Sequence, residues 1–278
     1  MTILTETYTL NNGVEIPKVG FGTWQIPNGQ KAYDAVADAL RAGYRHIDTA
    51  FAYGNEESVG AAIKDSGLAR KDVFITSKLP AEVKDAKKVE GYFNQTIQNL
   101  GVDYLDLWLI HAPWPWNRIG DNHDKDNIAV WAEMVKLYKA GKIRAIGISN
   151  FNDHDIANLI ANTDVVPAVD QIRYFAGFTQ PKNTAAAEKA GMLVEAYSPL
   201  ATGGLLDDPT ITRIADKNNV SVAQLALRFC LQNGTLPLPK ASSTAHIEAN
   251  TNLDFEISDA DMATLNALPQ QPGNKTQH

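Results

Sequence analysis

The stretch Tyr44-Arg45-His46-Ile47-Asp48-Thr49-Ala50-Phe51-Ala52-Tyr53-Gly54-Asn55-Glu56 has a form that the chain repeats with other polar residues. A short apolar run ends at the carboxylate of Asp48, a turn with a glycine follows, and a helical pattern then begins. The same criteria predict eight strands, at 18–22, 44–48, 73–78, 104–110, 143–148, 167–171, 192–197 and 235–239. Helical periodicity lies near 30–42, 55–66, 85–100, 127–140, 152–161, 181–190, 208–218 and 221–233.

This alternation predicts an α/β fold, the (β/α)8 TIM barrel. Two predicted strands, 105–110 and 143–148, are apolar at most successive positions, as expected for parallel strands covered by helices. The rival is an open doubly wound sheet. The sequence argues against it because no G-x-G-x-x-G motif follows the first predicted strand: Gly20-Phe21-Gly22 is continued by Thr23 and Trp24. We expect one barrel domain spanning 1–278.

Turn and cap signals set the limits of these elements. Asn12-Gly13 within alternating sequence predicts an N-terminal β-hairpin in 1–17 with a two-residue type I′ turn. Asp208-Pro209 and the capping box from Ser221 to Gln224 predict helix starts. The polar tail 269–278 is expected to be mobile. Glycines that can close helices in the left-handed conformation are Gly43, Gly101, Gly141, Gly191 and Gly234.

Composition excludes several classes of partner. The chain has 278 residues, a net charge of −7, and scattered rather than clustered Lys and Arg, which argues against nucleic acid and anionic membranes. The single cysteine, Cys230, lies in an apolar helix stripe and is expected to be buried, with no disulfide framework. No apolar run approaches ~20 residues, and Met1–Leu10 lacks the pattern of a secretory signal. We expect a cytoplasmic protein, a monomer or weak dimer.

Polar or aromatic residues follow every predicted strand. In a barrel these positions meet at the C-terminal face, where the active site is built. Taken singly, each has an ordinary structural explanation, such as a helix cap or a solvated cation. Their recurrence from the second strand to the eighth predicts a common site, made of Trp24, Asp48, Lys78, His111, Ser149, Asn150, Gln171, Tyr197, Ser198 and Lys240.

The motifs around these positions resemble the signatures of the aldo-keto reductase family. The likeness runs in order from Gly20 to about Ser258 and is strongest to prokaryotic members of the 2,5-diketo-D-gluconate reductase and glyoxal reductase type. The motifs that carry it are Gly43-Tyr44-Arg45-His46-Ile47-Asp48-Thr49-Ala50, Tyr53-Gly54-Asn55-Glu56, Ile75-Thr76-Ser77-Lys78-Leu79, Leu109-Ile110-His111, Gly147-Ile148-Ser149-Asn150-Phe151, Gln171-Ile172 and Ala196-Tyr197-Ser198-Pro199-Leu200.

The resemblance implies carbonyl reduction by a catalytic tetrad of Asp48, Tyr53, Lys78 and His111. Hydride addition builds negative charge on the carbonyl oxygen, which a proton from Tyr53 would neutralise. A lysine ammonium ~4 Å from the phenol is worth about 4 kcal/mol, or roughly three pKa units, at an effective dielectric near 20. This is an upper bound because Asp48 opposes it. His111 would orient the carbonyl.

The resemblance also implies an extended NADPH site. Ser149, Asn150 and Gln171 would bind the nicotinamide carboxamide, and Tyr197 would stack on the ring. The loop 198–204 offers backbone N–H groups to a pyrophosphate, although a plain strand-to-helix turn explains it as well. The remaining implied cofactor residues are Thr23, Ser198, Leu200, Lys240, Ser242, His246 and Asn250.

Three positions of the expected 2′-phosphate and adenine site depart from the family. Ala241 replaces the usual serine, His246 the usual arginine, and Ala249 the usual glutamate. A mostly neutral imidazole cannot fully replace a bidentate guanidinium on a phosphate. We therefore expect NADPH to be preferred over NADH less strongly than is usual, with NADH as a second cofactor.

The substrate pocket departs as well. Pro80 and Ala112 stand where the family has aromatics, while Trp114 and Trp116 are additional and Trp24 remains. Either the pocket is wider, or the two added tryptophans refill the gap. The acidic loop 121–126 lacks the glycine and terminal glutamate of an EF-hand, so we expect no metal.

Two other functions compete with a reductase. A barrel lyase could use Lys78 as a Schiff base, but Asp48 would keep that lysine charged, whereas a nucleophilic lysine needs a depressed pKa. A non-catalytic nicotinamide-binding regulatory subunit is the second alternative, and the intact tetrad argues against it.

Overall fold

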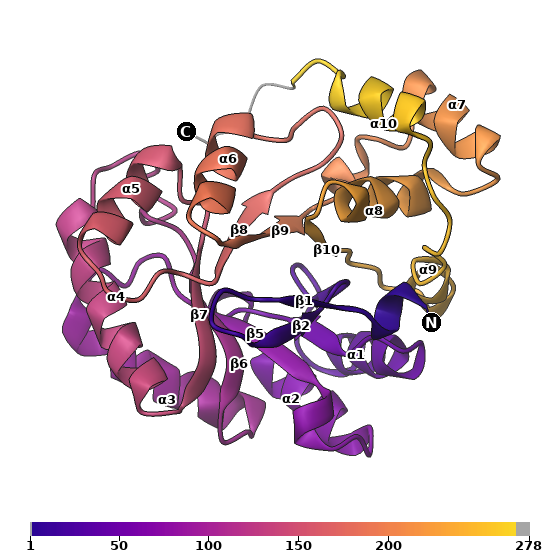
Figure 1. Ribbon diagram of the computed structural model, residues 1–278. Helices are drawn as coiled ribbons and strands as arrows, with labels where there is room; N and C mark the ends of the chain where they lie inside the picture. The colour runs from indigo at the N-terminus through magenta and orange to yellow at the C-terminus, as the bar shows by residue number, and fades with distance from the viewer. Residues whose placement is uncertain (1, 271–278) are drawn as a thin grey trace.

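The computed structural model describes residues 2–270 and shows a ring of parallel strands inside a layer of helices (Figure 1). The strands are β1 (Thr7–Thr9), β2 (Glu15–Pro17), β3 (Phe21–Gly22), β4 (His46–Asp48), β5 (Phe74–Leu79), β6 (Leu105–Ile110), β7 (Ile143–Ser149), β8 (Val169–Arg173), β9 (Leu193–Tyr197) and β10 (Leu236–Leu238). The helices are α1 (Gln30–Arg41), α2 (Glu56–Asp65), α3 (Val89–Leu100), α4 (Asp124–Lys139), α5 (Asp153–Ala161), α6 (Pro181–Lys189), α7 (Pro209–Lys217), α8 (Val222–Gln232), α9 (Thr244–Ala249) and α10 (Asp259–Asn266).

Strands β3 to β10 form one sheet in chain order, each parallel to the next. The ring closes between its first and last strands: the Gly20 N–H donates to Pro237 O at 3.1 Å and the Gly22 N–H to Pro239 O at 2.9 Å. A Cβ atom at Gly20 would lie 2.5 Å from a methyl carbon of Leu238 and 2.6 Å from the ring of His46, so glycine leaves room for these two buried side chains. The predicted (β/α)8 barrel is confirmed.

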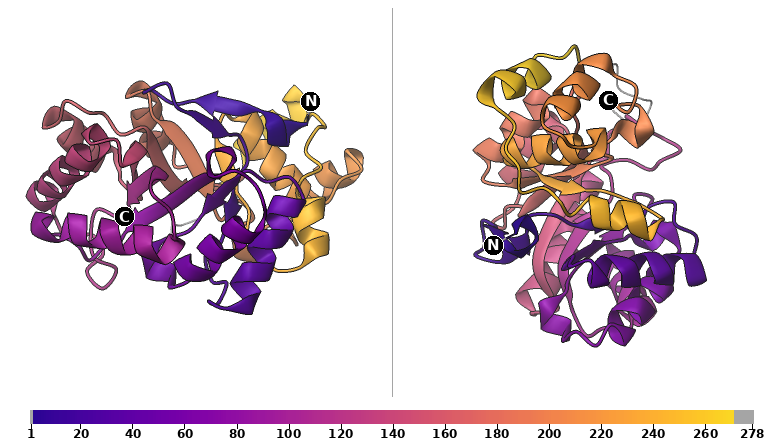
Figure 2. Two further views of the ribbon diagram at one scale, coloured as in Figure 1. Left: turned by 90° about the horizontal axis from the view of Figure 1, so that it is seen from below. Right: turned by 90° about the vertical axis from the view of Figure 1, so that its right-hand side faces the viewer.

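Alternation along the strands separates two cores. Outward side chains such as Ile47, Trp108 and Ile146 pack with the helices, which lie outside the strands in the further views of Figure 2. Inward side chains such as Leu107, Val169 and Leu236 form a smaller apolar cluster inside the ring. This cluster fills one end of the barrel and leaves the other end to polar residues.

The hairpin of β1 and β2 covers the apolar end of the barrel. Leu10 and Ile16 are buried in the inner cluster, and the side-chain amides of Asn11 and Asn12 donate to the carbonyls of Pro167 and Arg144. The hairpin lies across the ring of strands in Figure 1. The predicted hairpin is therefore present, as a plug at the end opposite the strand C-termini.

The predicted two-residue type I′ turn of the hairpin is wrong. The Leu10 N–H donates to Val14 O at 2.9 Å, and the Gly13 N–H donates to Leu10 O at 2.9 Å. Three residues therefore form the loop. Gly13 has φ +83, whereas Asn12 is not among the residues of positive φ. Only one position takes the left-handed conformation, as in a type I turn followed by a glycine bulge.

Helix limits follow the cap signals closely. The five predicted glycines have φ between +64 and +105, Asp208 caps α7 with Pro209 at its start, and Ser221 and Gln224 form a capping box at α8. Helix α10 was not predicted, although the hydroxyl of its N-cap, Ser258, accepts from the Asp261 N–H. Of the tail predicted to be mobile, 271–278 lie outside the described residues.

Two further expectations concern burial and membranes. Cys230 in α8 is fully buried, and burial raises the pKa of its thiol to about 12, as expected for an inert core residue. None of the helices within residues 2–270 has the length and apolar character needed to span a bilayer.

Candidate active site

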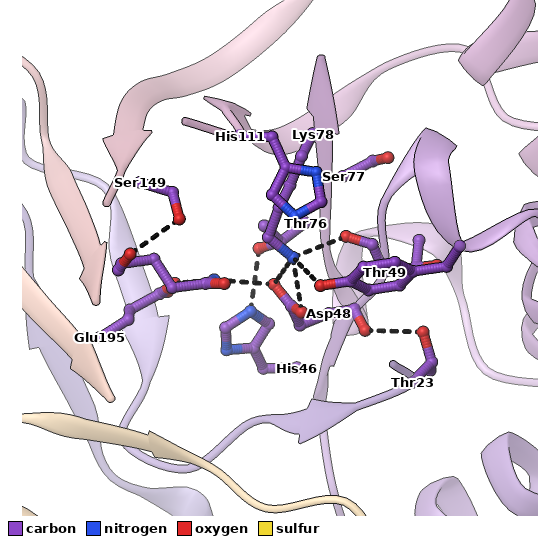
Figure 3. A network of polar contacts seen from close by, with 12 residues as sticks. Thr23, His46, Asp48, Thr49, Thr76, Ser77, Lys78, His111, Ser149 and Glu195 are labelled. Carbon is purple, nitrogen blue, oxygen red and sulfur yellow. Dashed lines mark hydrogen bonds and ion pairs between the residues drawn. The ribbon is translucent and has the colours of Figure 1, made fainter. Parts of the chain in front are cut away.

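The ammonium group of Lys78 lies at the centre of a buried polar network at the open end of the barrel (Figure 3). Lys78 Nζ contacts both carboxylate oxygens of Asp48 at 2.7 and 2.8 Å and donates to Thr49 O at 2.9 Å. These residues come from β5 and the end of β4, which are neighbours in the sheet. Burial alone would lower the pKa of Lys78, but Asp48 and Tyr53 raise it above its ordinary value. The lysine is therefore charged.

Tyr53 lies beside this cation. Its hydroxyl is 3.3 Å from Lys78 Nζ, and its ring meets the ring of His111 edge-on, with centroids 5.6 Å apart. Tyr53 ends a short 3-10 turn (Phe51–Tyr53) that Gly54 closes with φ +66. The strand-end turn thus brings Asp48, Tyr53, Lys78 and His111 together.

The pKa of Tyr53 differs from the expectation. Burial raises it above the ordinary value, and this effect exceeds the lowering by Lys78, while Asp48 raises it further. The expected acidified phenol is thus wrong for this structure, because removal from water disfavours phenolate more than one cation favours it. Tyr53 consequently holds its proton at neutral pH.

His111 is neutral. Burial, and secondarily the charge of Lys78, lower its pKa well below the ordinary value. Its Nδ1 has no hydrogen-bond partner within residues 2–270, and its ring also meets Trp116 edge-on at 5.5 Å. A neutral imidazole can donate from one nitrogen to an oxygen without bringing a second cation into the site.

Amide and hydroxyl groups from β7, β8 and β9 gather beside the network. Ser149 donates to Gln171 O at 2.7 Å. Asn150, at φ 62, donates to His111 O at 3.0 Å and accepts from the Tyr197 hydroxyl at 2.8 Å. The aromatic ring of Tyr197 and the polar side chains of Ser149, Asn150 and Gln171 suit a carboxamide attached to a flat ring. This set of groups fits a nicotinamide.

Other predicted cofactor residues are engaged within the protein. Thr23 is buried, and its hydroxyl donates to Asp48 O at 3.0 Å. In the loop after β9, Ser198 has φ 49 and accepts from the Ala201 N–H, while the Gly203 N–H donates to Leu200 O. Part of this loop's backbone is thus bonded in its own turns.

The predicted phosphate and adenine residues lie after β10 and are mostly exposed. Lys240, Ser242 and His246 have exposed side chains, whereas Asn250 is buried. Ser243 is the N-cap of the short helix α9 and accepts from the His246 N–H. These residues are close in sequence, but in the part of the chain that the structure describes no hydrogen bonds join their side chains to one another as they do in the network around Lys78.

The predicted substrate residues separate into two groups. Trp114 is buried with Ala81 and Ala112, and Trp116 packs against this cluster, which favours the second alternative, in which tryptophans refill the space beside small residues. Pro80 is buried as well. Trp24 is 45% exposed. Trp116, which is half-buried and faces His111, is the tryptophan best placed to bound a substrate.

Sequence reasoning missed three inward residues of the barrel. His46, Glu195 and Arg173 lie on strands at the same alternation phase as Asp48, Tyr197 and Gln171. His46 Nε2 contacts the Thr76 hydroxyl at 2.9 Å, and burial lowers its pKa to about 3. Period-two spacing from the predicted strand ends, counted back to His46 and Glu195 and forward to Arg173, would have identified all three.

One group of metal-ligand atom types lies at the first turns of α4 and α5, where the predicted acidic loop 121–126 leads into α4. Asp124, His154 and Asp155 have such atoms within 4.8 Å of one another. His154 contacts Asp124 at 3.1 Å, and Asp155 takes part in the capping box of α5 with Asn152. These hydrogen bonds account for the grouping without an ion.

Comparison with known proteins agrees with this geometry. A model of the Aldo/keto reductase family matches residues 18–269. The chain belongs to this family. A glyoxal reductase of Bacillus subtilis is 42% identical to this aldo/keto reductase over 268 residues, 96% of this chain and 94% of that protein.

Solved structures give the same relationship. An aldo/keto reductase from Brucella melitensis has a TM-score of 0.88 and 40% identity, covering 95% of this chain and 99% of that one. An aldo-keto reductase of Bombyx mori in complex with NADP has a TM-score of 0.86 and 32% identity, covering 95% and 93%. This aldo/keto reductase is thus an oxidoreductase that acts on aldehydes or ketones with a nicotinamide cofactor.

Proposed function

We propose that this aldo/keto reductase reduces aldehydes and ketones with NADPH, and that Tyr53 donates the proton. The observation that carries the proposal is the contact of 3.3 Å between the Tyr53 hydroxyl and the charged Lys78 amine, beside neutral His111. A proton donor, a cation and an uncharged hydrogen-bond donor are the groups that an oxygen gaining negative charge requires.

Lys78 acts on the phenolate that remains after proton transfer. Tyr53 is protonated at the start because burial raises its pKa. An alkoxide is more basic than a phenolate, so the proton moves to the substrate, and Lys78 stabilises the charge left on the phenol oxygen. Asp48 holds Lys78 with two contacts below 3 Å, so the ammonium does not have to reorganise during the reaction.

His111 and Trp116 orient the substrate. A neutral imidazole donates one hydrogen bond to the carbonyl oxygen and places it beside the Tyr53 hydroxyl. The buried Trp114 supports Trp116, whose ring lies 5.2 Å away edge-on. The apolar wall excludes water and strengthens the charge interactions around the reacting oxygen.

The nicotinamide cofactor supplies the hydride when bound. Ser149, Asn150, Gln171 and Tyr197 would hold its carboxamide and ring, and Thr23, Ser198 and Leu200 are further candidates for contacts with the cofactor. Lys240, Ser242, His246 and Asn250 would hold the phosphate and adenine end. Support for NADPH comes from the Bombyx mori relative solved with NADP and from the cation of Lys240.

The test is loss of NADPH absorbance with a panel of aldehydes, α-keto compounds and ketones. Glyoxal is included because the Bacillus subtilis relative is named for it. The variant Tyr53→Phe should lower kcat by about 100-fold to 10,000-fold while still binding NADPH. Tyr33→Phe, which removes a hydroxyl that donates to Asp65, is the matched control. Activity of Tyr53→Phe within tenfold of the unmodified protein would remove Tyr53 from this role.

The same samples separate the two alternatives. A lyase working through Lys78 would be trapped on its substrate by borohydride, and we expect no adduct because Asp48 keeps the lysine charged. A regulatory subunit would bind NADPH and oxidise none of it with any member of the panel. A cytoplasmic monomer or weak dimer stays a prediction.

A further inference from the structure

A buried carboxyl group on β9 contacts the candidate active site without touching either Tyr53 or Lys78. Glu195 is fully buried, and its Oε2 accepts from Gln171 Nε2 at 2.7 Å. The same nitrogen also donates to Asp48 Oδ2 at 2.9 Å. An amide nitrogen carries two hydrogens, so both of those on Gln171 are used between two acidic groups.

A continuous series of hydrogen bonds therefore crosses the barrel. It runs from Glu195 to Gln171, to Asp48, to Lys78 and to the hydroxyl of Tyr53, with links between 2.7 and 3.3 Å. The five residues come from β9, β8, β4, β5 and the turn after β4. Figure 3 shows Glu195 and Thr23 on opposite sides of Asp48.

Glu195 decides which way the Gln171 amide faces. With Glu195 and Asp48 both accepting from Nε2, the amide oxygen of Gln171 must face elsewhere. If Glu195 were an apolar residue, one N–H of Gln171 would lose its acceptor, and the amide could turn its oxygen towards Asp48. That orientation would repel the carboxylate that holds Lys78 and would present the wrong end of Gln171 to a carboxamide.

The groups that face Glu195 determine its protonation. Gln171 comes from β8, Asp48 and neutral His46 from β4, and Lys78 from β5, while the inward side chains of β10 are Leu236 and Leu238. Burial, and then the charge of Asp48, raise the pKa of Glu195 to about 8. Its Oε1 has no hydrogen-bond partner within residues 2–270, which costs less for a neutral carboxyl than for a carboxylate.

We propose that Glu195 is a positioning residue of this reductase, which orients Gln171 and through it holds Asp48 and Lys78 in place for proton donation by Tyr53. The inference rests on the proposed function. It adds a consequence for pH. When Glu195 loses its proton, a second negative charge lies near Lys78, which disfavours the Tyr53 phenolate and slows carbonyl reduction.

Two variants test separately the hydrogen-bond acceptor that Glu195 provides and the proton that it can lose. Glu195→Met keeps the volume and removes the acceptor, so NADPH affinity, measured by tryptophan fluorescence without substrate, should fall about tenfold, and kcat should fall at least as much. Glu195→Gln keeps an acceptor and cannot titrate. It should restore NADPH affinity and kcat to within about threefold at pH 7, and it should lack the decline in kcat that we expect between pH 7 and 9. Glu188→Gln on the exposed face of α6 is the control.

Each outcome decides the inference. NADPH affinity and kcat of Glu195→Met equal to those of the unmodified protein would overturn it, as would a decline above pH 7 that persists in Glu195→Gln. A loss in both variants with no rescue by Gln would assign Glu195 a packing role only and would also overturn it. If the proposed function is wrong, the unmodified protein reduces no member of the panel. The NADPH affinity of Glu195→Met would still test whether Glu195 orients Gln171.

Discussion

The two ends of the proposed cofactor site differ in how their side chains are held. At the nicotinamide end, Ser149 and Gln171 are buried and hydrogen-bonded to neighbouring strands or to the network around Lys78. At the phosphate end, Lys240, Ser242 and His246 are exposed. The polar groups at one end are thus held by the protein itself, whereas these three side chains at the other end are exposed to solvent.

This difference decides what a substitution should do. A buried polar group that loses its partner costs stability as well as function, because no water can replace the lost contact. An exposed cation that loses its ligand is simply solvated. We therefore expect variants at the nicotinamide end to affect folding and catalysis together, and variants at the phosphate end to affect binding alone.

The largest effect is expected for Lys78→Met. Without the ammonium, the Asp48 carboxylate is buried beside a thioether, and the free energy of unfolding should fall by about 3–5 kcal/mol, with carbonyl reduction abolished. Urea unfolding followed by circular dichroism measures the change. Lys240→Met is the matched control, and its effect should stay within about 0.5 kcal/mol. Equal effects at the two lysines would remove the distinction between the two ends.

The next effect concerns pH and Glu195. The folded protein keeps the Glu195 proton up to about pH 8, whereas the unfolded chain releases it near the ordinary value of 4.5. The free energy of unfolding should therefore fall as pH rises through this window, by about 3–4 kcal/mol from this group between pH 5 and 8. Urea unfolding at pH 5, 6, 7 and 8 should show a decline that Glu195→Gln lacks. Parallel curves for the two proteins would contradict the assigned protonation.

The smallest effect is expected at the exposed end, for His246→Arg. A guanidinium offers a charged, bidentate contact to a 2′-phosphate, so KM for NADPH should fall about threefold to tenfold while KM for NADH stays unchanged. Initial rates with both cofactors measure the ratio. His154→Arg, at an exposed position on α5, controls for added charge. A preference that His246→Arg leaves unchanged would place the 2′-phosphate elsewhere.

Local signals were enough for most of the fold. Strand and helix limits agree with the periodicity and caps to within a few residues, because glycines at helix ends and apolar strands act locally. The hairpin turn was wrong because Asn12-Gly13 suits two turn types, and the contacts of Asn11 and Asn12 with the strand starts favour the three-residue form. Helix α10 was missed although Ser258 and Asp261 carry a cap signal.

The sequence by itself determined the repeated strand–helix unit, the barrel and the polar residues at the strand ends, because each depends on periodicity within about 30 residues. Only the tertiary structure decided the protonation of Tyr53 and the position of Glu195 behind Gln171. The physical reason is that both depend on burial and on charges brought together from different strands, and those distances are set when the ring of strands closes.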